Sequence, residues 1–484
     1  MTKRFHVFHM IALAMLTSLV SCGAAPEQED PKTPSPTNII YFVGDGMGYN
    51  HVLAANYFEH GEAGAQVYEQ DDWFHVGQAT YSAARINSDG DTIYMNGYAP
   101  RTAWENPEYL MADYTDSGAA GTALSTGQKT IGGAIGLGMY GDTLTHIAQA
   151  AKAIDKSVGI VSSVPLSHAT PAAFIAHNHS RHNLEEIGKY MLFHTLADVI
   201  MAPGHPEYNN DGEAEEMSPR YIGSWELWEQ IKASDGRTEF VDGDEILYVQ
   251  DATGDGQRDP WTFIESREDF IALADGPAPR RVLGIPKVYS TLNQGRMRGE
   301  EAEMPFEQDF NENVPTLEEI TRASLNVLGQ NPEGFFVMIE GGAIDWAGHD
   351  NNLARLIEEQ VDFNNSVMAA VQWVEENSSW DETLIIVTSD HETGYLTGPN
   401  HPEVVADPVV NRGQGELPEV AWHSGSHTNM LVPFYAKGPG MELFDMFAEE
   451  KDPRKGPFLQ NTEIAQAIFL MWGKPEIDVH RLNK

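Results

Sequence analysis

The chain is poor in cysteine and in basic residues. Cys22 is the only cysteine among 484 residues, so no disulfide can form within one chain. Thirty Lys and Arg residues stand against 72 Asp and Glu residues, and the formal net charge is -42. Such an acidic chain repels phosphate backbones, which argues against nucleic acid as an electrostatic partner. It also repels small anions, so a site for an anionic substrate would need a local positive focus such as bound metals.

A long hydrophobic run is also missing. The apolar stretch from Ile11 to Val20 is too short to cross a membrane comfortably. Lys3 and Arg4 precede it, an arrangement typical of an export signal. We therefore expect the protein to be exported, to the periplasm or to the cell surface.

The end of this signal resembles a bacterial lipobox, because Leu19-Val20-Ser21 precedes Cys22. We expect residues 1–21 to be a lipoprotein-type signal peptide and Cys22 to carry a membrane anchor. The alternative is an ordinary secretory signal that is cut nearby. Residues 22–37 contain many Pro, Glu and Thr residues and are predicted to form a flexible tether.

Five short apolar runs border residues that could hold a metal or a phosphate, and helix-like stretches such as 144–154 and 316–328 lie between them. Alternating strands and helices predict an α/β fold, with a large, mostly parallel central sheet and helices on both faces. The active site of such a sheet gathers beyond the carboxyl ends of its strands. The runs are 39–43, 157–164, 335–339, 384–387 and 430–436.

We expect residues 38–484 to form a single catalytic domain of this kind. Residues about 205–280 are acidic, aromatic and short of periodicity, and are predicted to be an insertion over the site or at a subunit interface. Within them, Asp251 to Asp259 imitates a calcium loop, but Thr262 stands where the closing Glu belongs. An acidic turn is the favoured interpretation.

The run 335–339 leads into the most informative segment of the chain. Glu340 ends the run, and Asp345 and His349 follow at a spacing of four, which would place both on one side of a helical turn. Such a pair could supply two ligands to one divalent metal. On its own, the pair could also be solvated or could cap the helix.

Other runs end in similar residues. Asp45 follows the first run among glycines that allow a sharp turn, although an ordinary strand-to-helix turn would look the same. Asp390 and His391 follow the fourth run, and ionisable residues at such a mouth need a partner of opposite charge. The fifth run is preceded by two histidines, His423 and His427.

Ser117 is the candidate nucleophile. It opens a segment of small residues that could form a closely packed helix with Asp116 as its N-cap. The first amides of that helix, and a neighbouring metal, would favour the serine alkoxide. The alternative is an ordinary capped helix. Arg181, which follows Thr170, has a planar fork that suits two phosphoryl oxygens.

Taken in chain order, these motifs resemble the alkaline phosphatases over about residues 38–440. The set comprises Asp-Gly-Met-Gly at 45–48, Asp-Ser-Gly-Ala-Ala-Gly-Thr-Ala at 116–123, His-Ala-Thr-Pro-Ala-Ala at 168–173 with Arg181 after it, Glu-Gly-Gly-Ala-Ile-Asp-x3-His at 340–349, Ser-Asp-His-Glu at 389–392, and a late histidine. Each motif is modest, but the ordered set is specific.

The resemblance implies a homodimeric enzyme that hydrolyses phosphate monoesters to alcohol and inorganic phosphate through a phosphoserine on Ser117. It also implies two zinc ions and one magnesium ion, with Arg181 gripping the phosphate. The implied ligands are Asp345, His349 and His427 for the first zinc, Asp45, Asp390, His391 and Ser117 for the second zinc, and Asp45, Thr170 and Glu340 for magnesium.

Three further positions are expected to lie next to these ligands. His168 and Trp346 stand where some members of the family have Asp and Lys, so an imidazole would approach the magnesium shell and no lysine would reach the phosphate. His427 has the family's spacing to Gly438, so we choose it as the zinc ligand. We expect His423 to lie next to the site.

Two other functions remain open at this point. A phosphodiesterase of the same superfamily is one, although such members typically lack the magnesium site that Thr170 and Glu340 indicate. A lipid-anchored protein that binds phosphate without turnover is the other, and Ser117 with the full zinc set argues against it.

Overall fold

The computed structural model describes residues 35–233, 235–297 and 302–473. The predicted signal peptide 1–21, the anchor residue Cys22 and the tether up to residue 34 lie outside these residues. The described residues belong to one compact unit. None of its helices has both the length and the apolar character that crossing a membrane requires.

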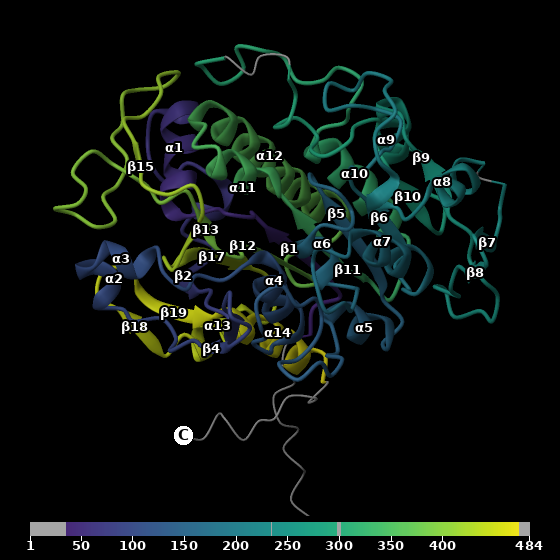
Figure 1. Ribbon diagram of the computed structural model, residues 1–484, viewed down its shortest axis with the longest axis horizontal. Helices are drawn as coiled ribbons and strands as arrows, with labels where there is room; N and C mark the ends of the chain where they lie inside the picture. Colours follow the sequence, from purple (N-terminus) through teal and green to yellow (C-terminus); the bar gives the residue numbers. More distant parts are fainter. Residues whose placement is uncertain (1–34, 234, 298–301, 474–484) are drawn as a thin grey trace, which may run out of the picture. The chain divides into compact units, whose positions relative to one another are not determined.

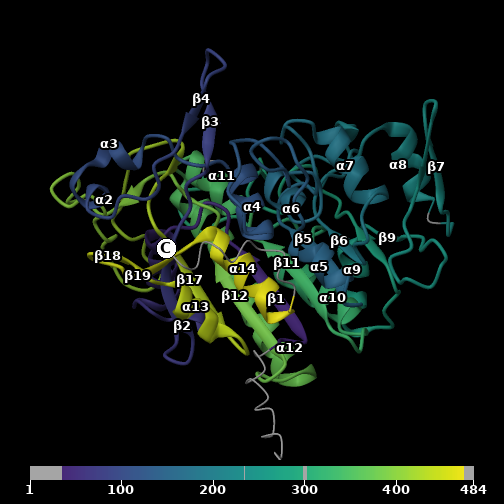
Figure 2. The same ribbon diagram turned by 90° about the horizontal axis from the view of Figure 1, so that it is seen from below.

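A mixed sheet of eleven strands forms the middle of this unit (Figures 1 and 2). The seven strands from β12 to β9 are parallel, β17 is antiparallel to β12, and the predicted mostly parallel sheet is confirmed. The spatial order is β18 (Glu450–Asp452), β19 (Gly456–Gln460), β2 (Phe74–Ala79), β17 (Val432–Lys437), β12 (Thr383–Thr388), β1 (Asn38–Val43), β11 (Phe335–Glu340), β5 (Ser157–Ser162), β6 (Val199–Met201), β10 (Val282–Gly284) and β9 (Thr262–Ile264).

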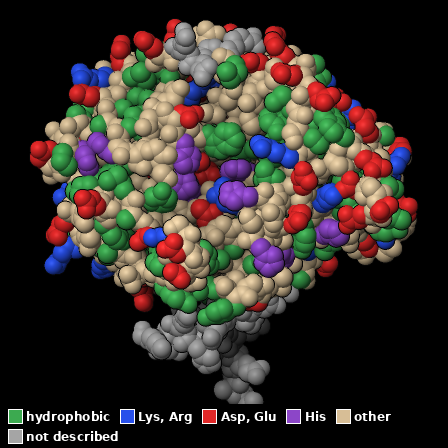
Figure 3. All heavy atoms as spheres, in the orientation of Figure 1, with side chains coloured by type: hydrophobic (Ala, Val, Ile, Leu, Met, Phe, Trp, Pro, Cys, Tyr) green, Lys and Arg blue, Asp and Glu red, His purple; other side chains and the backbone are tan. Residues whose placement is uncertain are grey.

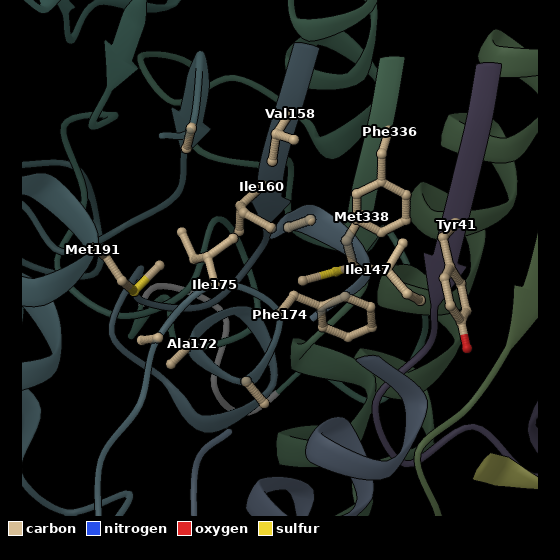
Figure 4. Close-up of a cluster of buried hydrophobic side chains, with 14 of the residues drawn as sticks. Tyr41, Ile147, Val158, Ile160, Ala172, Phe174, Ile175, Met191, Phe336 and Met338 are labelled. Atoms are coloured by element: carbon tan, nitrogen blue, oxygen red, sulfur yellow. The ribbon is translucent and has the colours of Figure 1, made fainter. Parts of the chain in front are cut away.

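The central strands are apolar because helices cover both of their faces. Successive side chains of a strand point to opposite faces. In β1, Ile39, Tyr41 and Val43 therefore enter one hydrophobic core, while Ile40 and Phe42 enter the other. Figure 4 shows part of the first core, where Tyr41 lies near Phe174 and near the β11 side chains, with the β5 side chains beyond them.

Two groups of helices supply the other halves of these cores. The helices with residues in the first core are α4 (Ser117–Thr126), α5 (Ile147–Lys152), α6 (Ala169–Ala173), α7 (Leu184–Phe193), α8 (Trp225–Lys232), α13 (Met441–Phe447) and α14 (Asn461–Met471). The helices with residues in the second are α1 (Tyr49–His60), α9 (Arg267–Asp275), α10 (Leu317–Leu328), α11 (Ala343–His349) and α12 (Leu353–Asn377).

The remaining elements are short and lie in the connections. The β3–β4 hairpin projects from the rest of the unit in Figure 2. The elements are α2 (Thr102–Glu105), α3 (Pro107–Leu110), the pairs β3 (Ala84–Ile86) with β4 (Thr92–Tyr94), β7 (Glu239–Asp242) with β8 (Glu245–Tyr248), β13 (Glu392–Thr393) with β16 (His427–Thr428) and β14 (Leu396–Thr397) with β15 (Ala421–Trp422), and the 3-10 turns Val67–Glu69 and Pro219–Tyr221.

Residues 205–280 build one end of the structure. Their strand β9 pairs with β10 and forms the outer edge of the central sheet, and α8 and α9 pack beside it. None of the described residues that line the cleft around Ser117 and Arg181 comes from this region. A position at a subunit interface stays a prediction.

The Asp251 to Asp259 segment is a turn whose carboxylates serve its own backbone. Asp251 accepts hydrogen bonds from the N–H groups of Gly254 (2.7 Å), Asp255 (3.1 Å) and Gly256 (2.7 Å). Asp259 accepts one from Thr253 N–H at 2.9 Å. These hydrogen bonds are those of an acidic turn, which was the favoured interpretation of this segment.

The register of the central strands brings their carboxyl ends to one level. Val43 of β1 stands opposite Glu340 of β11 and Thr388 of β12, and Glu340 stands opposite Ser162 of β5. Polar residues that follow these strands therefore start from neighbouring points at one edge of the sheet.

Candidate active site

The predicted site residues meet at this edge. Asp45 lies two residues after β1, Asp390 lies two residues after β12, and Glu340 is the last residue of β11. All three carboxylates are buried. Figure 3 shows histidine, acidic and basic side chains gathered around a hollow on one face of the molecule.

Three groups of ligand atoms lie in the site, each compact enough to hold one cation, and all their residues are buried except the partly buried His168. Donor atoms of Asp45, Asp390 and His391 lie within 4.8 Å of one another, and so do those of Asp45, His168 and Glu340. The third such set joins Asp345 and His427 to His391.

His349 completes the cluster around Asp345. The Nε2 atoms of His349 and His427 lie 3.3 Å and 3.5 Å from the two Asp345 carboxylate oxygens and 3.2 Å from each other. The other ring nitrogens face backbone carbonyls, with His349 Nδ1 2.8 Å from Gly425 O and His427 Nδ1 2.9 Å from Thr115 O. Such second contacts fix an imidazole with Nε2 free to act as a ligand.

Asp45 lies between the other two groups. His391 Nε2 lies 3.5 Å from Asp45 Oδ1 and 3.1 Å from Asp390 Oδ2. On the other side, the Thr170 hydroxyl, carried by α6, lies 3.4 Å from Asp45 Oδ2. Asp45 can therefore bridge two cations, as the sequence motifs imply.

The electrostatics of these carboxylates call for positive charge. Burial, and then the charges of Asp390, Asp345 and Glu340, raise the pKa of Asp45 well above its usual range. Burial raises the pKa of Glu340 to about 8 and that of Asp390 to about 7. Four buried carboxylates so close together are unfavourable unless cations offset their charge.

Unpaired polar atoms point to the same need. Asp45 Oδ1, Glu340 Oε1, Asp390 Oδ2 and His168 Nδ1 are buried without a hydrogen-bond partner among the described residues. Buried polar atoms nearly always have a partner, so several atoms without one at a single site indicate a place where a ligand binds. Carboxylate and imidazole donors suit divalent metal ions, and the residues present fit such ions.

Ser117 stands beside these groups as the first residue of α4. The Asp116 side chain caps this helix by accepting hydrogen bonds from the N–H groups of Gly118 and Ala119, which confirms the predicted N-cap. Ser117 Oγ lies 3.2 Å from His391 Nε2. The serine thus meets both a helix N-terminus and a candidate metal ligand.

Arg181 reaches the same place. Its Nη1 donates to Asp116 Oδ2 at 3.0 Å, and the pair is only partly exposed. The guanidinium is therefore aimed by the residue that also caps the Ser117 helix. A cleft of about 450 Å³ opens above these groups, and it is lined by Ser117, His168, Arg181, Asp345, Trp346, His349, Asp350, Ser426 and His427.

Of the three residues expected next to the metal ligands, two lie in the cleft and one, His423, lies outside its described lining. The rings of His168 and Trp346 are 5.8 Å apart, both residues line the cleft, and His168 belongs to the group of Asp45 and Glu340. His423 is not among the described residues of the cleft. Its Nε2 faces the Thr397 hydroxyl at 2.8 Å, and its ring lies tilted against the ring of His401.

Comparisons with known proteins agree with this geometry. The sequence model of one family, described as alkaline phosphatase, matches residues 36–415. The chain belongs to the alkaline phosphatase family. It is a phosphomonoesterase hydrolase, and its buried Asp and His groups are candidate metal sites.

Relatives match along most of their length. Alkaline phosphatase 3 of Bacillus subtilis (strain 168) is 25% identical over 531 residues, covering 95% of this chain and 96% of the relative. The alkaline phosphatase of Escherichia coli (strain K12) is 28% identical over 429 residues, covering 83% and 81%. The crystal structure of a cold-active alkaline phosphatase from the psychrophile Shewanella sp. has a TM-score of 0.60 at 25% identity and covers 91% of this chain and 100% of that chain.

Two residues of this candidate site were not predicted from the sequence. The Thr393 hydroxyl donates to Asp345 Oδ1 at 2.5 Å and lies 3.3 Å from His391 Nδ1, so it holds ligands of two groups. Ser162 donates to Glu340 Oε2 at 2.5 Å. The only sequence feature that could have identified Thr393 is its position two residues after His391. Nothing in the sequence shows that this threonine contacts ligands of two groups.

Proposed function

We propose that this phosphomonoesterase works by a two-step transfer through Ser117, at a site for two zinc ions and one magnesium ion. The observation that carries the proposal is the position of Ser117 at a capped helix N-terminus, beside buried carboxylates that lack partners. A binding protein without turnover would not need a serine hydroxyl aimed at a candidate metal ligand.

The donor sets suggest where each ion is held. Nitrogen and oxygen donors suit zinc. Two sets supply both kinds of donor: one comprises Asp345, His349 and His427, and the other comprises Asp45, Asp390 and His391. Oxygen donors suit magnesium, and Asp45, Thr170 and Glu340 supply them, with His168 beside them. In a solved structure of a mutant TAB5 alkaline phosphatase, in which an aspartate replaces a histidine, magnesium is bound in the M3 site.

Ser117 is the nucleophile of the first step, and water is the nucleophile of the second. When bound, the cations act as Lewis acids that stabilise the negative charge of the reacting phosphoryl oxygens and of the leaving alkoxide. Ser117 Oγ loses its proton and attacks phosphorus in line, so an Oγ–P bond forms and the ester P–O bond breaks. The leaving oxygen takes up a proton and departs as the alcohol. Water then attacks phosphorus, the Oγ–P bond breaks, and inorganic phosphate leaves.

Positioning comes from the fixed polar residues around Ser117. Arg181, held by Asp116, presents its guanidinium fork to two phosphoryl oxygens. Trp346 contributes no charge to the cleft, so this chain relies on Arg181 and on the cations to attract the substrate. The transition state of phosphoryl transfer is loose, and positioning and charge supply most of the catalysis.

The test is mass spectrometry of protein quenched in acid during turnover of a chromogenic phosphate monoester. We expect a phosphoryl group on Ser117. Ser117→Ala should lose turnover by at least about 10³-fold yet remain above the uncatalysed rate, because the cations and Arg181 stay in place. Ser426→Ala, which alters another cleft serine, should keep the phosphoserine. An unmodified Ser117, or full turnover by Ser117→Ala, would mean direct attack by water.

We also propose that the enzyme is exported as a homodimer and is anchored to a membrane through Cys22. The lipobox and the single cysteine support the anchor. Cys22→Ser should move the protein from the membrane fraction to the soluble fraction of the producing cell. Equal membrane association of the variant and the unaltered protein would exclude lipidation. Sedimentation of the soluble variant would show whether two chains associate.

A further inference from the structure

A second cavity lies apart from the catalytic cleft. It has a volume of about 210 Å³ and shares no described lining residue with the cleft. The β13–β16 pair stands between the two, because Glu392 of β13 lines the cavity and His427 of β16 lines the cleft. The residues that matter for its chemistry are Tyr49, Tyr98, Ala103, Trp104, Leu110 and Lys455.

The aromatic wall of this cavity is fixed in place. Asp452 accepts hydrogen bonds from Tyr98 Oη at 2.9 Å and from Trp104 Nε1 at 2.8 Å. Tyr98 also packs edge-on against Phe458, with ring centres 5.4 Å apart. The segment that carries both aromatic residues is thereby tied to the β18–β19 hairpin. A ligand would meet a pocket that already exists, which favours binding.

Two hydrogen-bond donors at the cavity are unused. Lys455 Nζ lies 3.6 Å from the centre of the Tyr49 ring and forms no ion pair with a described carboxylate. The Tyr49 hydroxyl has no hydrogen-bond partner among the described residues. Asp452 is the acid whose charge acts on Lys455, but its oxygens already accept four other hydrogen bonds, two of them from Arg454 N–H and Lys455 N–H.

The two carboxylates that line the cavity, unlike its donors, already have hydrogen-bond partners in the protein. Glu69 accepts hydrogen bonds from Asn56 Nδ2 at 2.7 Å and from Gln66 N–H at 3.1 Å. Glu392 accepts them from the Thr428 hydroxyl at 2.5 Å and from Leu396 N–H at 3.1 Å. The cavity thus has spare donors and a cation, while both of its carboxylates have donors of their own. This balance selects a ligand that brings an acceptor with negative charge.

We propose that this cavity binds a small aromatic carboxylate. Its ring would lie against Tyr98, Trp104 and Leu110, and its carboxylate would accept hydrogen bonds from Lys455 Nζ and from the Tyr49 hydroxyl. The volume is suitable, since an apolar cavity of about 150 Å³ can hold benzene, and a phenyl ring with a short acidic side chain needs somewhat more.

The test is isothermal titration of the metal-loaded protein with phenylacetate, and with phenylacetamide as the uncharged counterpart. We expect saturable binding of phenylacetate and at least fivefold weaker binding of the amide. Lys455→Met keeps the aliphatic stem and removes the charge, and should weaken phenylacetate at least fivefold. Lys451→Met, on the same hairpin and exposed, is the matched control and should change nothing.

Ala103→Leu tests the cavity itself, because Ala103 is buried in its wall and a larger side chain would fill it. This variant should abolish binding. Binding that survives both Ala103→Leu and Lys455→Met, or that inorganic phosphate displaces, would belong to the catalytic cleft and overturn the proposal. Absence of binding would overturn it too, as would a change of sedimentation in Ala103→Leu, which would assign the cavity to a second copy of the chain.

Discussion

Two clusters of buried acids in this protein receive their positive charge from different sources. At the catalytic edge, Asp45, Glu340 and Asp390 have no ion pair with a described Lys or Arg, and each keeps a buried oxygen without a partner. On α12, the Glu358 carboxylate is buried between two arginines. Its Oε2 lies 2.9 Å from Arg296 and 3.0 Å from Arg355.

The two clusters differ in where the compensating positive charge comes from. Both clusters face the same penalty for burying charge. In the α12 cluster the chain itself supplies the guanidinium groups, so the charge is balanced within the fold and serves its stability. At the catalytic edge the chain leaves the negative charge of the carboxylates uncompensated. Bound cations can therefore supply the positive charge there. The first cluster should therefore govern activity and the second should govern stability.

The largest expected effect is the loss of one cation from the catalytic cluster. His427→Ala removes a donor from the Asp345 group and should lower turnover by roughly 10³- to 10⁴-fold, because Lewis-acid stabilisation is worth several kcal/mol. His423→Ala, outside the described cleft, should cost much less. Elemental analysis of both purified variants, with turnover of a chromogenic monoester, checks this. If only the His423 variant loses zinc, the assignment of the late histidine is reversed.

Breaking the α12 cluster should have the opposite profile. Glu358→Gln leaves two buried arginines with an incomplete partner and should lower the free energy of unfolding by about 3–5 kcal/mol. Turnover at low temperature should stay unchanged, because the cluster does not line the cleft. Urea unfolding with turnover at 10 to 20 °C measures both quantities. Glu375→Gln, on an exposed position of α12, is the matched control, and a large drop in turnover without loss of stability would contradict the division proposed here.

A second buried acid of α12, Glu359, should make stability depend on pH. Burial, and then the charge of Asp362, raise the pKa of Glu359 from 4.5 to about 8. The folded protein therefore binds more protons than the unfolded chain between these values, and stability should fall as pH rises through the interval. Glu359→Gln cannot ionise, so it should be more stable than the unaltered protein at pH 9 by roughly 5 kcal/mol, because the interval from 4.5 to about 8 contributes about 1.4 kcal/mol per pKa unit.

Urea unfolding at pH 5 and at pH 9 checks this difference. The gain from Glu359→Gln should be present at pH 9 and nearly absent at pH 5, where the unaltered carboxyl is already protonated in the fold. Glu375→Gln serves again as the control, since its exposed carboxyl should give no pH-dependent gain. Equal stability of Glu359→Gln and the unaltered protein at pH 9 would mean that Glu359 is ionised with a partner.

The sequence predicted the central sheet and most of the site because both follow from local patterns. The runs around Ile39, Phe336 and Leu384 are apolar on both faces, as buried parallel strands must be. The polar residues after them fall at one edge because parallel strands end together. The spacing of Asp345 and His349 was informative for the same reason, since both lie on one helix, α11.

Contacts between distant segments could not be read in this way. Asp116 was recognised as an N-cap, but its hold on Arg181 joins residues 65 positions apart. The choice between His423 and His427 depended on spacing alone until the pairing of β13 with β16 placed His427 beside Asp345. The arginines that balance Glu358 come from two places, Arg355 one turn away and Arg296 from a separate loop.

The sequence identified the candidate residues for the chemistry of this protein, because ligand and nucleophile types recur in fixed order after apolar strands. The packing of the fold settled which buried charges the chain balances and which are left for cations. Glu340 and Glu358 are both buried glutamates, and their roles differ because packing puts arginines against one and other carboxylates against the other. Electrostatic partnership depends on distances across the fold, which local sequence does not encode.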